Sequence, residues 1–473
     1  MPDLRRISGV LVVLAAVVLG SGTALAHTDF DSSSPADGAV LDAPVDTVTI
    51  LFTNPATPVG DEFTALDATG QVRTPTSVSV VGDRVFELHF DPALAGGEIG
   101  IRWKVQAGDA HPIEGSFSFT VTAPLTTEAE PIDAGQTVPP GDLDEFLAVD
   151  TGSPGDALSR TGRLLGLLGV VLGIGTFAVL ALVLRGTRTE LHSTVGAVRI
   201  LGVVVAVGAC IEYIGVARVA GISLADNLST SAGAAAVLRV IGGVGLAAGL
   251  TAHSTVALGP RGRTAPPLAT VTPAADQPTT GGMDRSDHPM RWRADSSSWM
   301  AYVGVGLLIV SFWFDGHTVS KGIRPLHAVV NSVHLIAGSV WAGGVVAIAA
   351  IMWVRFRRGQ PTQAHDLLLR FSPFATLALV AVALAGLVMA VFVLDSFGEL
   401  TSSEWGQILL LKTAAVALAA AGGAYNHFRL IPALDATPGD ENLLAQARST
   451  VTAEAIMLVF VVVVTAWLVT AAS

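Results

Sequence analysis

Nitrogen and oxygen ligands for a metal ion lie near the start of the chain. His27 follows Ala24-Leu25-Ala26, a small-residue site after a basic start and an apolar run, and this pattern predicts a signal peptide over residues 1–26. Cleavage there would give His27 a free α-amine beside its imidazole, and these two nitrogens can chelate one metal ion. The alternative is that His27 is simply the first residue after the cleavage site.

A second pair of candidate ligands lies in the loop Gly108–Pro112. Asp109 and His111 are two residues apart, so their side chains point the same way on an extended backbone. A carboxylate and an imidazole presented together can bind a divalent metal, and tetragonal nitrogen and oxygen ligands favour Cu(II). The same residues are also typical of a turn in which the Asp is hydrogen-bonded to the backbone.

A third group of polar residues lies in and beside an apolar stretch. Asp315 and His317 precede it, and His327, Asn331 and His334 follow within it at spacings that place them on one helix face. His327 and His334 would be about 10 Å apart along the helix axis. One ion cannot bind both at once, but it could pass from one to the other. Polar groups are costly in lipid and usually face a partner or a water-filled cavity.

Glu212, Lys412 and Glu454 are further ionisable residues in apolar stretches. They are further candidates for a functional role, and we include Glu212 in the possible path of the ion through the membrane. The alternative is structural: Glu212 with Arg218, and Lys412 with Glu454, could form buried ion pairs.

The elements that position the first two sites read as strands. Residues 45–52, 84–90, 99–105 and 115–121 alternate between apolar and polar side chains, and turn signals separate them. We expect about seven strands over residues 27–123, forming a small β-sandwich. Trp103, Phe117 and Phe119 are predicted to lie in its core.

The rest of the chain reads as a linker and a membrane domain. Residues 124–157 are acidic and rich in Pro, Gly and Thr, which predicts a flexible linker. A domain over residues 158–473 follows, and most of its apolar stretches are long enough to span the membrane core. The loop 259–298 is expected to be disordered. The eight stretches are 162–184, 195–217, 232–258, 299–314, 326–354, 372–395, 406–427 and 451–471.

The charge pattern orients the chain and limits its chemistry. Arginines gather in the loops that lie inside if the β-sandwich lies outside, so we expect a multi-pass cell-membrane protein with an extracytoplasmic N-terminal domain. The net charge of −12 lies mostly in the N-terminal third and argues against nucleic acid as a partner. The single cysteine, Cys210, excludes Cys-x-x-Cys metal sites. No ATP-binding or pump motif is present, and we expect no enzymatic activity.

The N-terminal motifs resemble the CopC family of periplasmic copper-binding proteins. The resemblance rests on His27, on Ser34-Pro35-Ala36-Asp37-Gly38-Ala39 and on the segment Asp109–Phe119. It implies a cupredoxin-like sandwich that binds one Cu(II) through the α-amine and imidazole of His27, Asp109 and His111. Because residues 27–123 contain no methionine, the Cu(I) site of some CopC proteins is not expected.

The C-terminal region resembles CopD. The motifs are Phe314–Thr318, His334–Gly344, Arg370-Phe371-Ser372, Leu410-Leu411-Lys412 and Ala424-Tyr425-Asn426. A CopC–CopD fusion, as in YcnJ-like proteins, implies an all-α bundle of eight transmembrane helices that imports copper from the CopC domain. Copper tolerance by sequestration or export, and haem-based electron transfer, are the alternatives. Besides copper and the lipid membrane, a separate copper reductase and a cytosolic copper chaperone are candidate partners.

Overall fold

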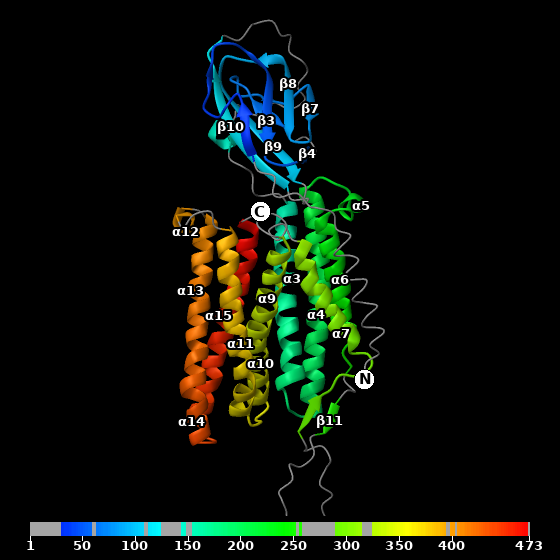
Figure 1. Cartoon of the computed structure of the whole chain (residues 1–473), viewed down its shortest axis with the longest axis vertical. Coiled ribbons are helices and arrows are strands. Elements are labelled where there is room, and N and C mark those ends of the chain that lie inside the picture. The colour runs from blue at the N-terminus through cyan, green and yellow to red at the C-terminus, as the bar shows by residue number, and fades with distance from the viewer. Residues whose placement is uncertain are drawn as a thin grey trace, which may run out of the picture.

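The computed structural model describes residues 30–58, 63–107, 112–123, 143–147, 154–251, 255–257, 289–314, 324–393, 398–402 and 404–471. These residues form a β-sandwich and a bundle of long helices. In Figure 1 the sandwich lies beyond the end of the bundle at which α5 (Leu224–Asn227) and α12 (Glu399–Ser402) are found. The predicted pairing of an all-β domain with an all-α membrane domain is confirmed.

Two sheets make up the sandwich. One has the order β1-β3-β8-β7, with β1 (Phe30–Ser34), β3 (Val45–Phe52), β8 (Val85–Leu94) and β7 (Ser77–Val81). The other sheet has the order β2-β10-β9-β5-β6, and β4 also pairs with β9. Its strands are β2 (Val40–Leu41), β10 (Pro112–Val121), β9 (Gly97–Ala107), β5 (Thr64–Leu66), β6 (Val72–Arg73) and β4 (Ala56–Pro58). Ten strands in the described part exceed the predicted seven because several have only two or three residues, too few to show alternation.

The core of the sandwich lies between the two sheets. Every second residue of β3 from Val48 to Phe52 is buried, as the alternating pattern predicts. From the other sheet Trp103, Phe117 and Phe119 are buried against them, which confirms their predicted place in the core.

Part of the expected linker is structured, which corrects the prediction for that part. Residues Leu143–Leu147 form the single helical turn α2, and this turn packs on β9. Its apolar side chains cover Gly100, where a Cβ would lie only 2.7 Å from Leu143 Cδ1. Ser116 Oγ also donates a hydrogen bond to the carbonyl of Leu147 across 2.8 Å. The apolar side chains of α2 are spaced three and four residues apart, so they share one helix face. A pattern of a single helical turn is too short to be recognised within a polar segment.

Each of the eight apolar stretches forms a helix over at least part of its length. Seven helical segments of the described residues are long and apolar enough to cross a membrane, and the segment Trp299–Phe314 forms a shorter apolar helix. The helices are α3 (Pro154–Ala178), α4 (Arg188–Val219), α6 (Ser231–Ala248), α7 (Trp299–Ser311), α9 (Arg324–Gly338), α10 (Gly344–Arg357), α11 (Ala364–Val393), α13 (Glu404–Tyr425), α14 (Ile431–Ala436) and α15 (Glu441–Ala471).

The third apolar stretch ends as a strand, not as a helix. Helix α6 stops at Ala248, and β11 (Thr255–Ala257) pairs with β12 (Met290–Trp292). The expectations of a helical stretch to residue 258 and of disorder throughout 259–298 are therefore wrong at these two places. Gly249 ends the helix, and β-branched Thr255 and Val256 favour an extended backbone. Trp292 anchors β12 because its buried ring packs edge-on against Phe177.

Three long helical segments of the described residues contain a π-helical turn, and one of these turns, Val179–Val183, follows α3. The turn Ser339–Gly343 joins α9 to α10, and the turn Asn426–Leu430 joins α13 to α14. The turn Ser339–Gly343 packs directly on α3: a Cβ at Gly175 would lie 2.3 Å from the carbonyl oxygen of Ser339. Only a glycine permits this close approach of two backbones, which fixes α9 against the bundle.

Candidate functional site

The expected ligands His27, Asp109 and His111 lie outside the described residues, but the segments on either side of them are described. β1 begins at Phe30, which lies opposite Phe52 at the end of β3. Shortly after Phe52, Ala56 pairs with Ala107, the last residue of β9. The start of β1 and the end of β9 therefore lie at the same end of the sandwich.

Aromatic packing ties these two segments together. The ring of Phe30 stacks on Trp103 of β9, with ring centroids 5.7 Å apart. Trp103 in turn lies over Gly115 of β10, where a Cβ would be 2.4 Å from the indole ring. A glycine at this position of the predicted Gly-Ser-Phe motif thus lets the indole cross its neighbouring strand.

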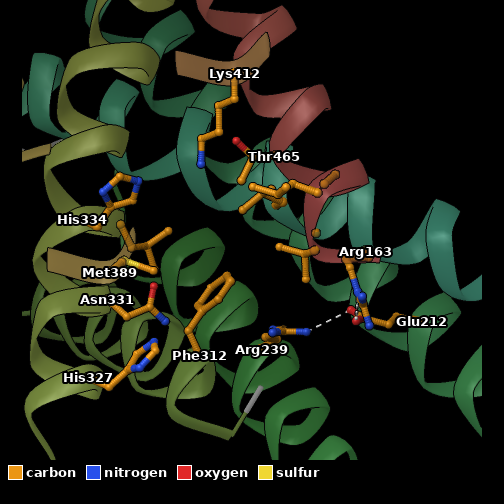
Figure 2. A pocket seen from close by; sticks show the side chains of 16 residues that line it. Arg163, Glu212, Arg239, Phe312, His327, Asn331, His334, Met389, Lys412 and Thr465 are labelled. Atoms are coloured by element: carbon orange, nitrogen blue, oxygen red, sulfur yellow. Dashed lines mark hydrogen bonds and ion pairs between the residues drawn. The ribbon is translucent and has the colours of Figure 1, made fainter. Parts of the chain in front are cut away.

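The membrane bundle encloses a cavity of about 210 Å³. It is mostly apolar, with a small number of polar side chains directed into it, as is typical of binding sites. Its lining comes from α3, α4, α6, α9, α11, α13, α15 and the turn after α7, and the labelled side chains of Figure 2 are Arg163, Glu212, Arg239, Phe312, His327, Asn331, His334, Met389, Lys412 and Thr465.

One side of the cavity is formed by the predicted face of α9. His327, Asn331 and His334 all line it, one above the other in Figure 2, and His327 is only 1% exposed. The structure therefore brings together three of the predicted residues on one helix face. Asp315 and His317 lie outside the described residues.

The geometry of His334 leaves one ring nitrogen for a ligand. Its Nδ1 lies 3.2 Å from the carbonyl oxygen of Val382 on α11. Because a carbonyl oxygen can only accept, this contact assigns the ring proton to Nδ1 and the lone pair to Nε2. Gly386, one turn further along α11, makes room for the ring: a Cβ there would lie 3.4 Å from His334 Cε1.

The opposite side of the cavity is an ion-pair network. Oε1 of Glu212 accepts from Arg163 Nε across 3.1 Å, and Oε2 accepts from Arg239 Nη1 across 2.9 Å. The guanidinium of Arg239 also lies over the ring of Phe312, 4.8 Å from its centroid. Glu212 thus joins α4 to α3 and α6. The partner considered from the sequence, Arg218, was wrong, because residues distant in the chain supply the arginines.

Met389 and Lys412 complete the polar lining. Met389 of α11 lies beside Asn331 and His334 in Figure 2, and Lys412 of α13 lies beyond His334. Met389 was missed from the sequence because a methionine in an apolar span looks like any core residue. Only the packing of α11 on α9 reveals that it faces the histidines.

These side chains do not form a compact metal site. Among the described residues, no three of His, Cys, Asp and Glu lie close enough to hold one metal ion. The cavity therefore offers separate ligands along its wall, in keeping with the calculated separation of His327 and His334.

Glu454 belongs to a different place in the bundle. It lines a smaller cavity, on α15, together with Asn426 and His427, whereas Lys412 lines the larger cavity. The carboxyl of Glu454 is hydrogen-bonded by the side chains of Asn426 and Trp341. The pairing of Lys412 with Glu454 considered from the sequence is therefore wrong.

Known families match both halves of the chain. The family described as "CopC domain" matches residues 30–122, and the family described as "Copper resistance protein D" matches residues 365–468. The Copper resistance protein C of Xanthomonas campestris pv. juglandis is 32% identical over 117 residues, which are 23% of this chain and 91% of that protein.

Two further relatives match in part. The Copper transport protein CutJ of Bacillus subtilis (strain 168) is 30% identical over 108 residues, 23% of this chain and 20% of CutJ. The Inner membrane protein YebZ of Escherichia coli (strain K12) is 29% identical over 119 residues, 25% of this chain and 40% of YebZ. The chain thus spans less than half the length of either protein.

With a CopC domain, a CopD domain and seven apolar helices of spanning length among its described residues, the chain belongs to the CopC family and is a CopC–CopD fusion, a copper-handling multi-pass membrane protein.

Proposed function

We propose that this protein captures Cu(II) outside the cell membrane and passes copper through its CopD domain into the cell. The α-amine and imidazole of His27, with Asp109 and His111, hold the Cu(II). His317, with Asp315, receives the copper at the outer mouth of the membrane domain. His327, Asn331 and His334 then lead it inward along one wall of the cavity, and Glu212 lies on the opposite wall. The observation that supports this path best is the shared placement of His327, Asn331 and His334 on one cavity wall.

The chemistry of the outer ligands fits Cu(II). Two imidazoles, an amine and a carboxylate form the tetragonal nitrogen and oxygen set that Cu(II) prefers. The register of β1, β4 and β9 supports a single site, because Phe30 and Ala107 lie at the same end of the sandwich. His27 lies three positions before Phe30, a reach of about 10 Å for an extended chain.

The chemistry of the cavity favours Cu(I). The thioether of Met389 is a soft ligand, and imidazole binds both oxidation states. Copper therefore has to be reduced between the two domains, and a separate copper reductase supplies the electron. On the inner side a cytosolic copper chaperone takes the metal.

The loop arginines support the proposed orientation of the chain. Arg357, the last residue of α10, and Arg358, the next residue, are exposed at the same end of the bundle as Arg429 next to α14. This end faces the cytoplasm under the positive-inside rule. The β-sandwich, beyond the opposite end in Figure 1, is then extracytoplasmic and tethered near the outer mouth.

Copper uptake into cells that express the full chain tests this function. Wild type should raise cellular copper, and His27→Ala and His334→Ala should each lose that rise, with cleavage after Ala26 verified in every strain. His365→Ala is the matched control, because His365 lies outside the cavity, 3.6 Å from Asp435. Normal uptake by His334→Ala would contradict the cavity path.

Two other functions give different results in the same cells. Copper tolerance by sequestration or export, which the name of the Xanthomonas relative favours, predicts a lower copper content with the wild type. A haem protein predicts a Soret band in the purified chain. Both histidines that line the cavity lie on α9, whereas haem held by a histidine pair needs facing helices, so the geometry favours copper.

A further inference from the structure

Glu454 is a buried carboxyl group that two π-helical turns hold in place. Asn426 Nδ2, at the start of one turn, donates to Glu454 Oε2 across 3.0 Å. The indole of Trp341, in the middle of the other turn, bonds to the same carboxyl. Glu454 is 7% exposed and Asn426 is 5% exposed. π-Helical turns are rare and often lie at functional sites, and here two of them converge on one acid.

The donors around Glu454 are neutral. Of the described residues that line its cavity, only Glu454 and His427 are titratable. The other charged groups on α15 and on the elements that pack against it do not line this cavity. Arg163 binds Glu212, Arg355 binds Glu190, Arg370 binds Asp366, Asp435 lies near His365, Arg448 lies over Phe356, Lys412 lines the larger cavity, Asp156 lies in the first turn of α3, and Arg160, Arg357, Arg358, Arg429 and Glu441 are exposed.

A buried carboxylate without a nearby cation is costly, and binding a proton removes that cost. A metal ion is a poorer fit. The two N–H donors already occupy lone pairs of the carboxyl group and turn their positive ends toward it. The all-oxygen shell of a hard cation would need several more ligands than one carboxyl and one amide can supply.

The cavity beside Glu454 contains a hydrogen-bond acceptor that a water molecule can satisfy. Oδ1 of Asn426 is buried and has no hydrogen-bond partner among the described residues. The cavity measures about 50 Å³, room for a few water molecules. Gly423 keeps this space open, since a Cβ there would lie 3.1 Å from Glu454 Oε1. Water here could donate to Asn426 and carry a proton to and from Glu454.

The same cavity reaches the surface through a second hydrogen bond. Ser372 Oγ lies 2.6 Å from His427 Nδ1, and both residues line the cavity. His427 is exposed, on the turn that begins with Asn426. An exposed imidazole bonded to a hydroxyl can accept and donate protons, so this pair is a suitable entry for protons from this end of the bundle.

We propose that Glu454 is a proton-binding site whose loading and release are coupled to copper movement. The coupling rests on the proposed copper import, whereas the proton site does not. The proton moves between a Glu454 oxygen and water in the small cavity, and from there through Ser372 and His427 to bulk water. Only O–H and N–H bonds form and break, so no further reactant is needed.

The proton site is tested first, without copper. Infrared difference spectra between acid and alkaline pH are recorded on the purified full chain in lipid. The wild type should show the C=O stretch of a buried protonated carboxyl, which Glu454→Gln removes and Asn426→Ala shifts. Glu441→Gln, which removes an exposed carboxyl from the same helix, should leave the band unchanged. Identical spectra for wild type and Glu454→Gln would overturn the proposal.

Coupling is tested in vesicles that hold the full chain, with copper entry followed at different pH gradients. The wild-type rate should change about tenfold with the gradient, an ordinary coupling effect. Glu454→Gln should move copper at a rate that the gradient no longer alters, and Glu441→Gln should behave as wild type. An unchanged gradient response in Glu454→Gln would overturn the coupling. A wild type that moves no copper would contradict the proposed function and the coupling, and the infrared result would still decide the proton site.

Discussion

Nε of Arg355 donates a hydrogen bond to Oε1 of Glu190 across 2.6 Å and joins the end of α10 to the start of α4. The other carboxylate oxygen accepts the backbone N–H of Thr187 across 2.9 Å, so the same glutamate caps α4. Arg355 is 2% exposed and Glu190 is 7% exposed. Because Arg355 directly follows the apolar stretch 326–354, the sequence predicts that it lies in a loop on the inner side of the membrane. It is instead a buried connector between helices.

Arg355→Met should therefore destabilise the bundle strongly. Removing one partner of a buried pair leaves the other charge uncompensated, at a cost of about 3–5 kcal/mol. The measurement is thermal unfolding of the purified full chain in detergent. Arg357→Met is the matched control, because Arg357 is two residues away on the same helix and exposed. Equal unfolding temperatures for the two variants would show that the pair contributes nothing.

Gly175→Ala should disrupt the contact between α3 and the turn Ser339–Gly343. The added Cβ would lie 2.3 Å from the Ser339 carbonyl oxygen, so two backbones must move apart. Overpacking of this kind costs about 1–3 kcal/mol or more, which should lower the unfolding temperature. Gly196→Ala, on α4, makes the same chemical change where nothing lies within 4 Å, and it should be neutral or slightly stabilising. A Gly175→Ala chain as stable as wild type would contradict the close crossing.

The sequence predicted those features that depend on local periodicity. Val45–Phe52 alternates and is β3 with the same bounds, and the four-and-three spacing of His327, Asn331 and His334 places all three on one cavity wall. The short strands and α2 are too brief to repeat a pattern. The predicted stretch 232–258 extends beyond the end of α6 at Ala248, because apolar character alone does not distinguish a helix from a strand.

Partners across the bundle could not be predicted, because they depend on how helices pack. Glu212 binds Arg163 and Arg239, from helices on either side of its own in the chain, and not Arg218 nearby. Trp341, Asn426 and Glu454 are far apart in the sequence and meet only because two π-helical turns bring them together. The ligation of Cu(II) by His27, Asp109 and His111 stays a prediction, since those residues lie outside the described part of the chain.

His27→Ala should remove high-affinity Cu(II) binding from the full chain. It deletes the imidazole of the proposed site, and the α-amine alone cannot complete the tetragonal set. Electron paramagnetic resonance of Cu(II) added to the purified, cleaved protein should lose the nitrogen-rich spectrum of the wild type. His89→Ala is the control: His89 lies on β8 of the same sandwich and bonds Thr47 through Nδ1 across 3.0 Å. Loss of the same spectrum in His89→Ala would place the site elsewhere.

Met389→Leu should weaken Cu(I) binding in the membrane cavity without unfolding the bundle. Leucine keeps the volume and apolar character of the side chain, and only the soft sulfur ligand is lost. We expect an affinity about tenfold lower, the effect of about 1.4 kcal/mol. The affinity is measured by competition with a chromophoric Cu(I) chelator, in a chain that also contains His27→Ala, so that the exported domain does not contribute.

X-ray absorption of the same samples gives a second reading, because a copper–sulfur distance should be present with Met389 and absent with leucine. Met457→Leu is the matched control: Met457 is half-buried like Met389, but it packs against the core of the bundle, on α15, and does not line the cavity. Sulfur scattering that persists in Met389→Leu and disappears in Met457→Leu would show that the sulfur ligand of copper lies outside the cavity. Copper would then cross the bundle on imidazoles alone, and the column of His327 and His334 would have to carry it without the thioether.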